Sequence, residues 1–432
     1  MTSGALDLHL SRVQRELYED TRALASAELA PVAAAGEPGR VNRRLVRALA
    51  EHGLLARLFA DGSVAAMDLC LIREALARHC TEAETAFAVQ GLGTYPILQA
   101  GRPELVEEWL PRVAAGEAVA AFALTERDAG SDVAALALAA EPLAEPAAGS
   151  EPGTGSEPGT GGEPGTGGEP ETGSEPGTGD EPETGSEPGT GDEPGTGGEP
   201  ETGYRLTGEK LWISNAPDAD LYTVFARTSE DPRRGITAFA VPGDAAGLTG
   251  EPIEFLSPHP IGRLRFDGVQ VPAGSVLGEP GTGFRVAMRT LDLFRPSVGA
   301  FAIGMARAAL DAACEHASTR HTFGRPLKDH QAIAHRLADV TARVHAARLT
   351  VHHAARAHDE GIGDPALSAM AKLLATEAGQ EAVDLAVQVH GAQALEHGHP
   401  LEHLYRDVRA PRIYEGASEI QREIIARSLF GR

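Results

Sequence analysis

The sequence predicts a chain in three parts, with helices at both ends and a β domain between them. Apolar residues recur at three- and four-residue spacing near both ends, which is typical of helices. In the middle they form short runs separated by turn residues, which is typical of antiparallel strands. We expect a helical N-terminal domain at residues 1–120, a middle antiparallel β domain at 121–281 and a C-terminal four-helix bundle at 282–432.

The elements of the first two domains follow from these patterns in chain order. Helical apolar stripes predict N-terminal helices over residues 6–24, 41–52, 65–78 and 104–110. Alternating or short apolar runs predict strands over residues 121–124, 133–140, 204–206, 221–226, 236–241 and 264–266.

The C-terminal domain has longer helical patterns, beginning near Phe284. Helices are predicted over residues 296–319, 333–351, 367–389 and 418–429, and four such helices predict a bundle. The stripe of the third helix consists of Leu367, Met370, Leu374, Ala378, Ala382, Leu385 and Val389.

A tract of nine hexapeptides interrupts the predicted β domain at residues 150–203. Each unit has the form [S/G/D]-E-P-[G/E]-T-G, and the tract holds twelve Glu, two Asp and no Lys or Arg. Such a composition offers no apolar side chain to bury and predicts disorder. A solenoid is the alternative, but six residues of this kind cannot build a hydrophobic layer. Since a strand is predicted on each side, the tract most simply replaces a hairpin turn, at roughly 2 kcal/mol of closure entropy.

Composition excludes several classes of protein. The chain has 432 residues, of which 42% are hydrophobic, so it can bury a sizeable core. It contains no run of 18 apolar residues and no secretion signal at its start, which predicts a cytoplasmic protein. A net charge of −24 argues against nucleic acid and anionic membranes as partners. Cys70, Cys80 and Cys314 form no Cys-x-x-Cys pair, so we expect small core residues and neither disulfides nor a metal site.

Glu415 lies at a predicted bend near the C-terminal end of the chain. Gly416 follows it, and Ser418 and Gln421 have the spacing of a helix capping box. An acid at a bend beside the positive end of a helix is a candidate general base. A solvent-exposed loop glutamate is the alternative interpretation of the same pattern.

Three other segments carry more polar chemistry than a packed core needs. Residues 122–132 join a strand to a Gly-Ser loop that could hold a phosphate or a flavin. Residues 208–215 place an indole beside a hydroxyl, which could stack on a planar ring and hydrogen-bond to it. Residues 320–331 set a cation and a hydroxyl at a helix end, where an anionic cofactor could bind. Taken singly, a turn, a core tryptophan and a charged helix end explain the three segments equally well.

Together and in order, these segments resemble the acyl-CoA dehydrogenase family. The shared motifs are ALTERDAGSD, GEKLWISN, an R-x-T-F-G-x-P turn with a downstream Gln, Q-V-H-G, and YEGASEIQR. The resemblance runs from about Glu16 to Arg432 with the repeat left out. It implies the same order of helical, β and four-helix domains. It also implies non-covalent FAD, and a homodimer or homotetramer in which a neighbouring subunit completes the FAD site.

The resemblance also implies roles for individual residues. Glu415 matches the catalytic base. Substrate contacts are implied for Ser131, Asp292, Arg295 and Gly416. Flavin-side contacts are implied for Phe122, Leu124, Thr125, Ser131, Trp212 and Ser214. Contacts to the rest of the FAD are implied for Arg320, Thr322, Gln331, Gln388, Gly391, Ala392, Ala417 and Glu419.

The reaction that this resemblance implies is α,β-dehydrogenation of an acyl thioester. The base takes the α-proton while a hydride passes from the β-carbon to flavin N5, and an electron-transfer flavoprotein or another acceptor reoxidises the cofactor. The thioester is an acyl-CoA or an acyl-carrier conjugate, which share the same pantetheine arm. Acyl-CoA oxidases and flavin monooxygenases are the alternatives on the same fold, and a non-catalytic scaffold is a third.

Two positions depart from the family pattern. The adenine-side loop is Gly-Gly-x-Gly in many members and here reads Gly-Ala-Gln-Ala from Gly391 to Ala394, so two methyl groups crowd a backbone that approaches a cofactor. Ala417 stands where a threonine hydroxyl often helps to bind FAD, which removes a hydrogen bond of about 1 kcal/mol.

Overall fold

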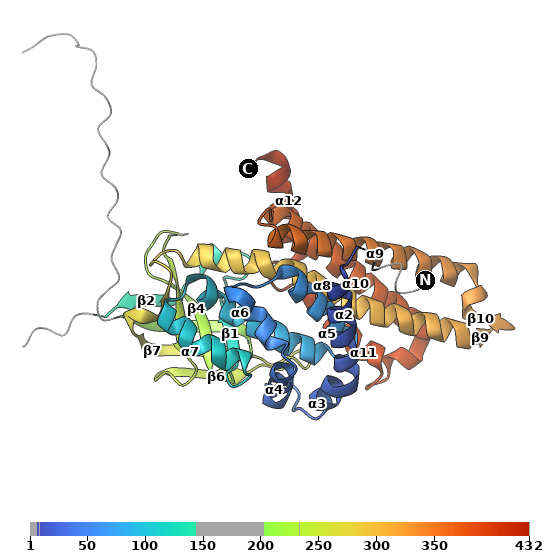
Figure 1. Cartoon of the computed structure of the whole chain (residues 1–432), viewed down its shortest axis with the longest axis horizontal. Helices are drawn as coiled ribbons and strands as arrows, with labels where there is room; N and C mark the ends of the chain where they lie inside the picture. The colour runs from blue at the N-terminus through green and yellow to red at the C-terminus, as the bar shows by residue number, and fades with distance from the viewer. Residues whose placement is uncertain (1–6, 8, 144–202, 233, 432) are drawn as a thin grey trace, which may run out of the picture. The chain divides into compact units, whose positions relative to one another are not determined.

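The computed structural model describes residues 7, 9–143, 203–232 and 234–431. Of the repeat, only Gly203 belongs to the described residues, so the predicted disorder of 150–203 lies outside them. Helices, a mixed β-sheet and long C-terminal helices follow one another along the chain (Figure 1). The predicted helix, sheet and helix order is therefore confirmed.

The N-terminal domain contains six α-helices and a π-helical turn among its described residues. They are α2 (Arg12–Leu24), a π-helical turn (Ala25–Leu29), α3 (Ala30–Ala34), α4 (Arg43–Glu51), α5 (Ala66–Ala77), α6 (Thr81–Ala100) and α7 (Pro103–Ala114). No helix was predicted over α6, because Gly91, Gly93 and Pro96 lower its helix propensity. Packing accounts for the helix and for one glycine: a Cβ at Gly93 would lie 2.6 Å from the backbone nitrogen of Ala121 in the sheet.

The middle domain is a sheet of eight strands. They are β1 (Ala120–Ala123), β2 (Ala139–Pro142), β3 (Tyr204–Ser214), β4 (Leu221–Arg227), β5 (Ile236–Pro242), β6 (Leu248–Pro252), β7 (Ile261–Val271) and β8 (Val276–Leu277). The order is β6-β7-β3-β2-β4-β5-β8, and β1 pairs with β4. Most pairs are antiparallel as predicted, whereas β1 with β4 and a single residue pair between β2 and β4 are parallel. The strands β6 and β8 were not predicted.

The repeat lies between two neighbouring antiparallel strands. Pro142 of β2 pairs with Tyr204 of β3, and the Leu143 N–H donates to the Gly203 carbonyl at 2.9 Å. The two strands that flank the repeat therefore pair with each other as the arms of a hairpin would.

Deleting residues 150–203 is expected to leave the fold intact. The deletion joins Gly149 to Tyr204, so that a glycine again stands where Gly203 stood. Only glycine suits that position, because its φ is 114° and a Cβ would lie 2.1 Å from the Val271 carbonyl oxygen. The free energy of unfolding should stay the same or rise by up to roughly 2 kcal/mol, since a short loop loses less entropy. Chemical denaturation of both proteins measures this, and an insoluble or less stable product would contradict it.

The C-terminal domain is built on long helices. They are α8 (Gly283–Thr319), α9 (Gln331–Asp359), α10 (Pro365–His390), α11 (Pro400–Asp407) and α12 (Ser418–Phe430), with a small hairpin of β9 (His321–Thr322) and β10 (Arg325–Pro326) after α8. The helices α8, α9 and α10 pack on one another, α5 packs on α8 and α9, and α12 packs on α10. Among the described helices, α8 alone is long and apolar enough to cross a membrane, and 72% of its most apolar window is buried inside the protein, as in a core helix.

The face that α10 buries differs from its apolar stripe. A Cβ at Gly299 of α8 would lie 3.1 Å from the Ala371 carbonyl oxygen, and one at Gly379 would lie 3.0 Å from the Ala302 carbonyl oxygen. Such close approach of two helices admits only small side chains. The large residues of the predicted stripe therefore turn outward: Leu367, Met370, Leu385 and Val389 are half-buried, and Leu374 is exposed. The prediction for Cys314 was also wrong, since Cys70 and Cys80 are buried and Cys314 is exposed.

Candidate functional site

Glu415 lies in a tight bend just before α12. Its φ is 52° and that of Gly416 is 90°, so two successive residues adopt the left-handed conformation that non-glycine residues rarely take. The carboxyl oxygen Oε2 of Glu415 is buried and has no hydrogen-bond partner among the described residues. A strained backbone and an unpaired buried oxygen together indicate a functional position.

The electrostatic surroundings of Glu415 are mixed. Burial raises the pKa of its carboxyl above the ordinary value. Nearby positive charges act in the opposite direction; they belong to Arg73, Lys372 and Arg295. The Arg73 guanidinium is itself paired with Glu84, whose pKa burial raises to about 7.

Side chains from three helices hold the carbonyl groups of this bend. Lys372 Nζ of α10 donates to the carbonyls of Tyr414 and Gly416, each at 2.6 Å. Gln421 Nε2 donates to the carbonyls of Gly416 at 2.8 Å and Glu415 at 3.3 Å. Arg295 Nε of α8 donates to the Glu415 carbonyl at 3.5 Å.

The predicted capping box at the start of α12 was wrong. Ala417 is the N-cap residue, and no side chain caps the helix. Ser418 instead donates to Glu377 Oε1 of α10 at 2.7 Å, while Gln421 binds the bend as described. Both side chains thus anchor the bend to its neighbours, a role that the Ser-x-x-Gln spacing could not distinguish from capping. Ala417 is half-buried and Glu419 is exposed.

Asp292 and Arg295 lie on the inner part of α8 beside this bend. Arg295 Nη1 and Asp292 Oδ1 form an ion pair at 2.5 Å, and Arg295 is 5% exposed. Burial raises the pKa of Asp292 and lowers that of Arg295. The predicted substrate residues of α8 therefore do lie next to Glu415 and Gly416.

The residues predicted to face a flavin gather in the β domain. The N–H of Leu211 donates to the Thr125 carbonyl at 2.9 Å, and buried Lys210 donates to the Leu124 carbonyl at 3.0 Å. These bonds bring the loop after β1, which carries Ser131, toward the end of β3. There Trp212 has a φ of 57° and leaves 43% of its surface exposed.

A loop between β6 and β7 joins this group to the helices. Ser214 Oγ and His259 Nε2 are 2.9 Å apart, and burial lowers the pKa of His259 to about 4, so this imidazole is neutral at pH 7. In the same loop, Ser257 hydrogen-bonds to Asp407 at the end of α11. Since α11 leads directly into the Glu415 bend, the loop ties the Ser214 group to that bend.

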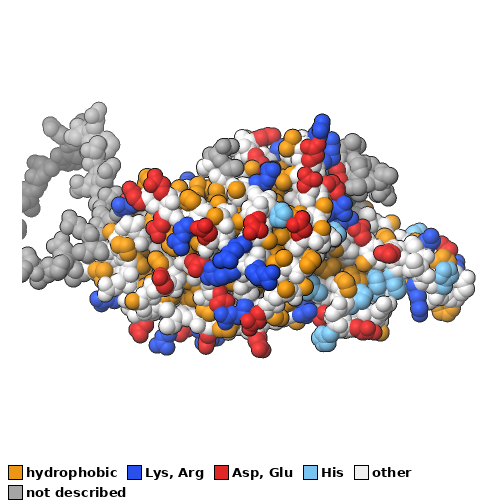
Figure 2. All heavy atoms as spheres, turned by 60° about the horizontal axis from the view of Figure 1, so that its bottom comes forward, with side chains coloured by type: hydrophobic (Ala, Val, Ile, Leu, Met, Phe, Trp, Pro, Cys, Tyr) orange, Lys and Arg blue, Asp and Glu red, His pale blue; other side chains and the backbone are white. Residues whose placement is uncertain are grey.

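Most of the remaining predicted FAD residues lie at the far end of α8, whereas Ala417 and Glu419 lie at the start of α12 beside Glu415. Arg320 follows this helix directly, Thr322 is in the β9–β10 hairpin and Gln331 begins α9. The side chains of His316 and His390 stack there with ring centroids 4.2 Å apart, which places the loop of Gln388, Gly391 and Ala392 at the same end. In Figure 2 histidine side chains gather toward the end that carries β9 and β10.

The two groups of predicted cofactor residues are widely separated within one chain. Arg295 contacts the Glu415 bend, and Arg320 comes 25 residues later, at the end of the same helix. At 1.5 Å per residue this separation is about 37 Å along the axis, longer than an extended FAD molecule. One chain therefore does not bring all the predicted cofactor residues to one site.

Comparison with known proteins decides what this arrangement is. Three family models match the chain: the acyl-CoA dehydrogenase N-terminal domain at residues 11–117, the middle domain at 172–269 and the C-terminal domain at 281–430. The chain belongs to the acyl-CoA dehydrogenase family. It is accordingly an oxidoreductase that uses FAD, as the motifs predicted.

Relatives of this acyl-CoA dehydrogenase match it along nearly its whole length. The chain is 32% identical over 429 residues to a cyclohexane-1-carbonyl-CoA dehydrogenase of Geobacter metallireducens, covering 96% of this chain and 97% of the relative. It is 27% identical, with a TM-score of 0.80, to a glutaryl-coenzyme A dehydrogenase in complex with glutaryl-CoA, covering 98% and 96%. The butyryl-CoA dehydrogenase from Megasphaera elsdenii gives the same identity and TM-score and covers 98% and 99%.

The residues of this acyl-CoA dehydrogenase fit FAD. The exposed indole of Trp212 offers a face to a planar ring, and the Glu415 carboxyl oxygen is buried with its hydrogen-bonding capacity unused. At the far end of α8, nothing lies within 4 Å of a Cβ built on Gly391, which leaves room for a cofactor to approach the backbone. Of the two extra methyl groups of this loop, that of Ala392 is exposed and that of Ala394 is buried in the protein.

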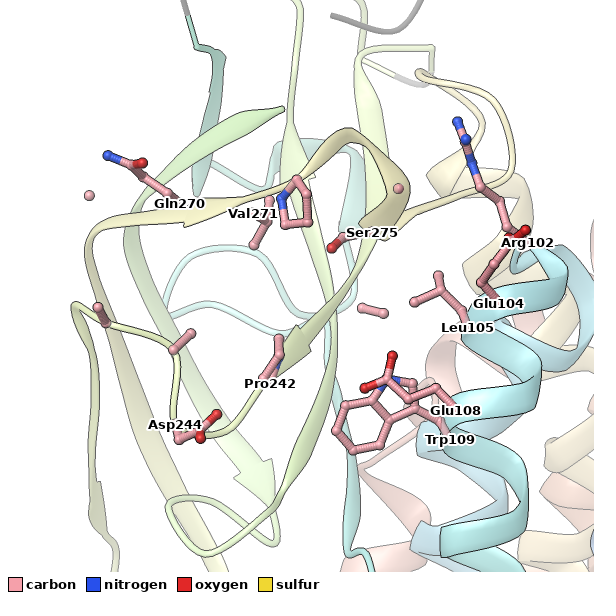
Figure 3. Close-up of a pocket in the computed structure, with 16 residues that line it drawn as sticks. Arg102, Glu104, Leu105, Glu108, Trp109, Pro242, Asp244, Gln270, Val271 and Ser275 are labelled. Atoms are coloured by element: carbon pink, nitrogen blue, oxygen red, sulfur yellow. The ribbon is translucent and has the colours of Figure 1, made fainter. Parts of the chain in front are cut away.

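A separate cleft of about 920 Å³ lies between α7 and the sheet (Figure 3). It is lined by Arg102, Glu104, Glu108, Asp244 and Gln270, among others. None of the predicted site residues lines it. This open cleft is not the place where the family motifs meet.

Sequence reasoning missed several residues of the site. Lys372, Arg73 and Glu84 lie in helical segments without any motif, and His259 lies in a loop of no recognisable pattern. Lys372 is a charged residue on the face of α10 that carries small side chains. This position indicates a buried lysine only once the structure has shown that this face is the buried one.

Proposed function

We propose that this acyl-CoA dehydrogenase oxidises the α,β bond of an acyl thioester with Glu415 as the base. The observation that carries the proposal is the buried, unpaired Oε2 of Glu415 at a strained bend. Bound FAD supplies the acceptor for the β-hydride. The chain's own contribution is to remove the α-proton and to stabilise the charge that develops on the thioester carbonyl.

The properties of Glu415 suit this task. A thioester α-proton is weakly acidic, so the base needs a pKa above that of an exposed glutamate, and burial supplies such a shift. The nearby cations keep the carboxylate charged in a dry site, because they offset part of the desolvation cost. The Glu415 N–H is a suitable donor to the thioester oxygen as that atom gains negative charge.

In this proposal two groups of residues bind FAD, one in the β domain and one at the far end of α8. Phe122, Leu124 and Thr125 with Ser131 would hold the flavin and diphosphate, while Trp212 and Ser214 would face the ring. The second group, at the far end of α8, would hold the adenosine side: Arg320, Thr322, Gln331, Gln388, Gly391 and Ala392. Ala417 and Glu419, at the start of α12, would contact FAD from the copy that carries the Glu415 bend. Asp292, Arg295 and Gly416 would bind the substrate beside Ser131.

A second copy of the chain supplies the second group in this proposal. Within one chain the two groups are about 37 Å apart along α8, which is too far for one FAD to contact both. The proposal therefore requires a homodimer or homotetramer with shared sites. The outward-facing stripe of α10 supports this proposal, since it leaves the large apolar side chain of Leu374 50% exposed. We further propose a cytoplasmic enzyme that passes its electrons to an electron-transfer flavoprotein.

Anaerobic mixing with a panel of thioesters tests the function. The purified protein should be yellow, and its flavin absorbance should bleach with at least one straight-chain, branched or cyclic acyl-CoA or acyl-carrier thioester. The panel also shows which carrier and acyl group the enzyme accepts. Protein that stays colourless after addition of FAD, or a flavin that no member bleaches, would contradict the proposal. Rapid reoxidation by oxygen without an added acceptor would indicate an oxidase instead.

A further inference from the structure

The ammonium group of Lys372 contacts the bend that carries Glu415 from the buried side of that bend. Its side chain is 1% exposed, and Nζ donates to the carbonyls on both sides of Glu415, those of Tyr414 and Gly416, at 2.6 Å each. Burial of a lysine is costly unless its charge finds partners, and here the partners found are two backbone carbonyls. The bend is therefore built around a buried lysine, whose pKa burial lowers to about 7.

The bond to Tyr414 fixes the direction of a second group. A trans peptide is planar, so the N–H of Glu415 points away from the carbonyl of Tyr414 to which it is joined. Holding that carbonyl toward Lys372 aims the Glu415 N–H to the opposite side. Among the described residues, no hydrogen bond engages this N–H. The donor is thus oriented and free.

We propose that Lys372 is a positioning residue that aims the Glu415 N–H at the thioester carbonyl oxygen and holds the Glu415 carboxylate at its bend. This inference rests on the proposed function. That function requires a correctly oriented base, and the inference assigns the orientation of Glu415 to Lys372. Lys372 touches neither substrate nor cofactor in this role and acts through the peptide groups of the bend.

The other donors at the bend cannot substitute for Lys372. Gln421 bonds to the carbonyls of Glu415 and Gly416, and Arg295 bonds to that of Glu415. The peptide that carries the Glu415 N–H has the Tyr414 carbonyl as its other end, and among the described residues this carbonyl accepts its hydrogen bond from Lys372. Loss of this lysine therefore frees that peptide to rotate while the rest of the bend stays tethered.

Two substitutions of Lys372 test the role, with one control. Lys372→Met keeps the shape of the side chain but removes charge and donors, whereas Lys372→Gln keeps a donor without the charge. Thr376→Val is the matched control, because Thr376 is buried one helical turn further along α10 and makes no contact with the bend among the described hydrogen bonds. All three proteins are purified with FAD, and flavin content and thermal midpoint are recorded first.

The decisive readout is the infrared carbonyl band of a bound enoyl-CoA labelled with ¹³C at the thioester carbon. In the wild type and Thr376→Val the band should lie below that of free enoyl-CoA, since hydrogen bonding weakens the C=O bond. In Lys372→Met the band should return toward the free position, and the bleaching rate at saturating acyl-CoA should fall by about 10²–10³-fold, as for loss of one oxyanion donor. Lys372→Gln should lie between these limits.

A second readout separates the charge from the hydrogen bonds. The lysine charge lowers the pKa of Glu415, so both variants should move the pH at which bleaching is half-maximal upward. Arg73, Arg295, Glu84 and Tyr414 interact electrostatically with Glu415 and stay unchanged. Asp292, which is paired with Arg295, and Asp407, which acts on Tyr414, also stay unchanged.

Several outcomes would overturn the inference while leaving the proposed function intact. One such outcome is that Lys372→Met bleaches at the wild-type rate. Another is that both variants bleach more slowly while their carbonyl band stays at the wild-type position. If Lys372→Met does not fold, Lys372→Gln decides by the same two measurements. Failure of the wild-type enzyme to bleach with any thioester would instead overturn the proposed function itself.

Discussion

Replacing Glu415 with glutamine is expected to abolish bleaching of the flavin by substrate while the flavin remains bound. The amide has nearly the same size and can occupy the same bend, but it cannot accept a proton at neutral pH. General bases contribute typically about 10²–10⁴-fold to rate, and here no other described carboxylate shares the bend, so the loss should reach or exceed the upper end. Stopped-flow absorbance under anaerobic conditions measures it directly.

The control for this experiment lies in the next helix. Glu423→Gln changes an exposed carboxylate of α12 whose contact is an ion pair with Arg427 at 2.9 Å. This variant should bleach at the wild-type rate and keep the same flavin spectrum. If Glu415→Gln bleached normally, the base would have to be another group, and the buried carboxyl of Glu84 would be examined next.

The sequence was a good guide to the order of elements and a poor guide to how they pack. The period of apolar residues depends on local geometry, so it predicted the helices α2, α4, α5 and α9 and most of the strands. The helix α6 was missed because Gly93 is required by contact with Ala121, which is far away in the sequence. The buried face of α10 was missed for a related reason: close helix packing selects alanine and glycine, and a stripe of large residues then marks the outer face.

The candidate site was predictable to the extent that single segments determine it. The bend at Glu415 follows from Gly416 and the start of a helix, and the structure places it there. The cations around that carboxyl come from α5, α8 and α10, and both α5 and α10 pack on α8. No sequence motif indicates that these helices are in contact. Family resemblance supplied the second group of predicted FAD residues, and the length of α8 is the observation on which we base the proposal that another copy of the chain supplies them.

Two inactive variants are expected to restore activity when they form mixed oligomers. Glu415→Gln disables proton removal at the active site of its own chain, whereas Arg320→Ala weakens the cofactor site that the same chain offers to its neighbour. In a mixed pair, one site combines the intact Glu415 of one copy with the intact Arg320 of the other, and the second site carries both defects. With free assortment, half of the pairs are mixed and one of their two sites works, which gives about a quarter of wild-type activity.

Co-expression with two different affinity tags provides the measurement. Sequential purification isolates the mixed pairs, which should have about half of wild-type activity because one of their two sites works. Each variant alone, purified identically, gives the background. A site made within one chain would leave every mixed oligomer inactive, because each chain would keep its own defect. Recovery of activity would therefore support the proposal that a neighbouring chain brings Arg320 to the FAD that faces Glu415.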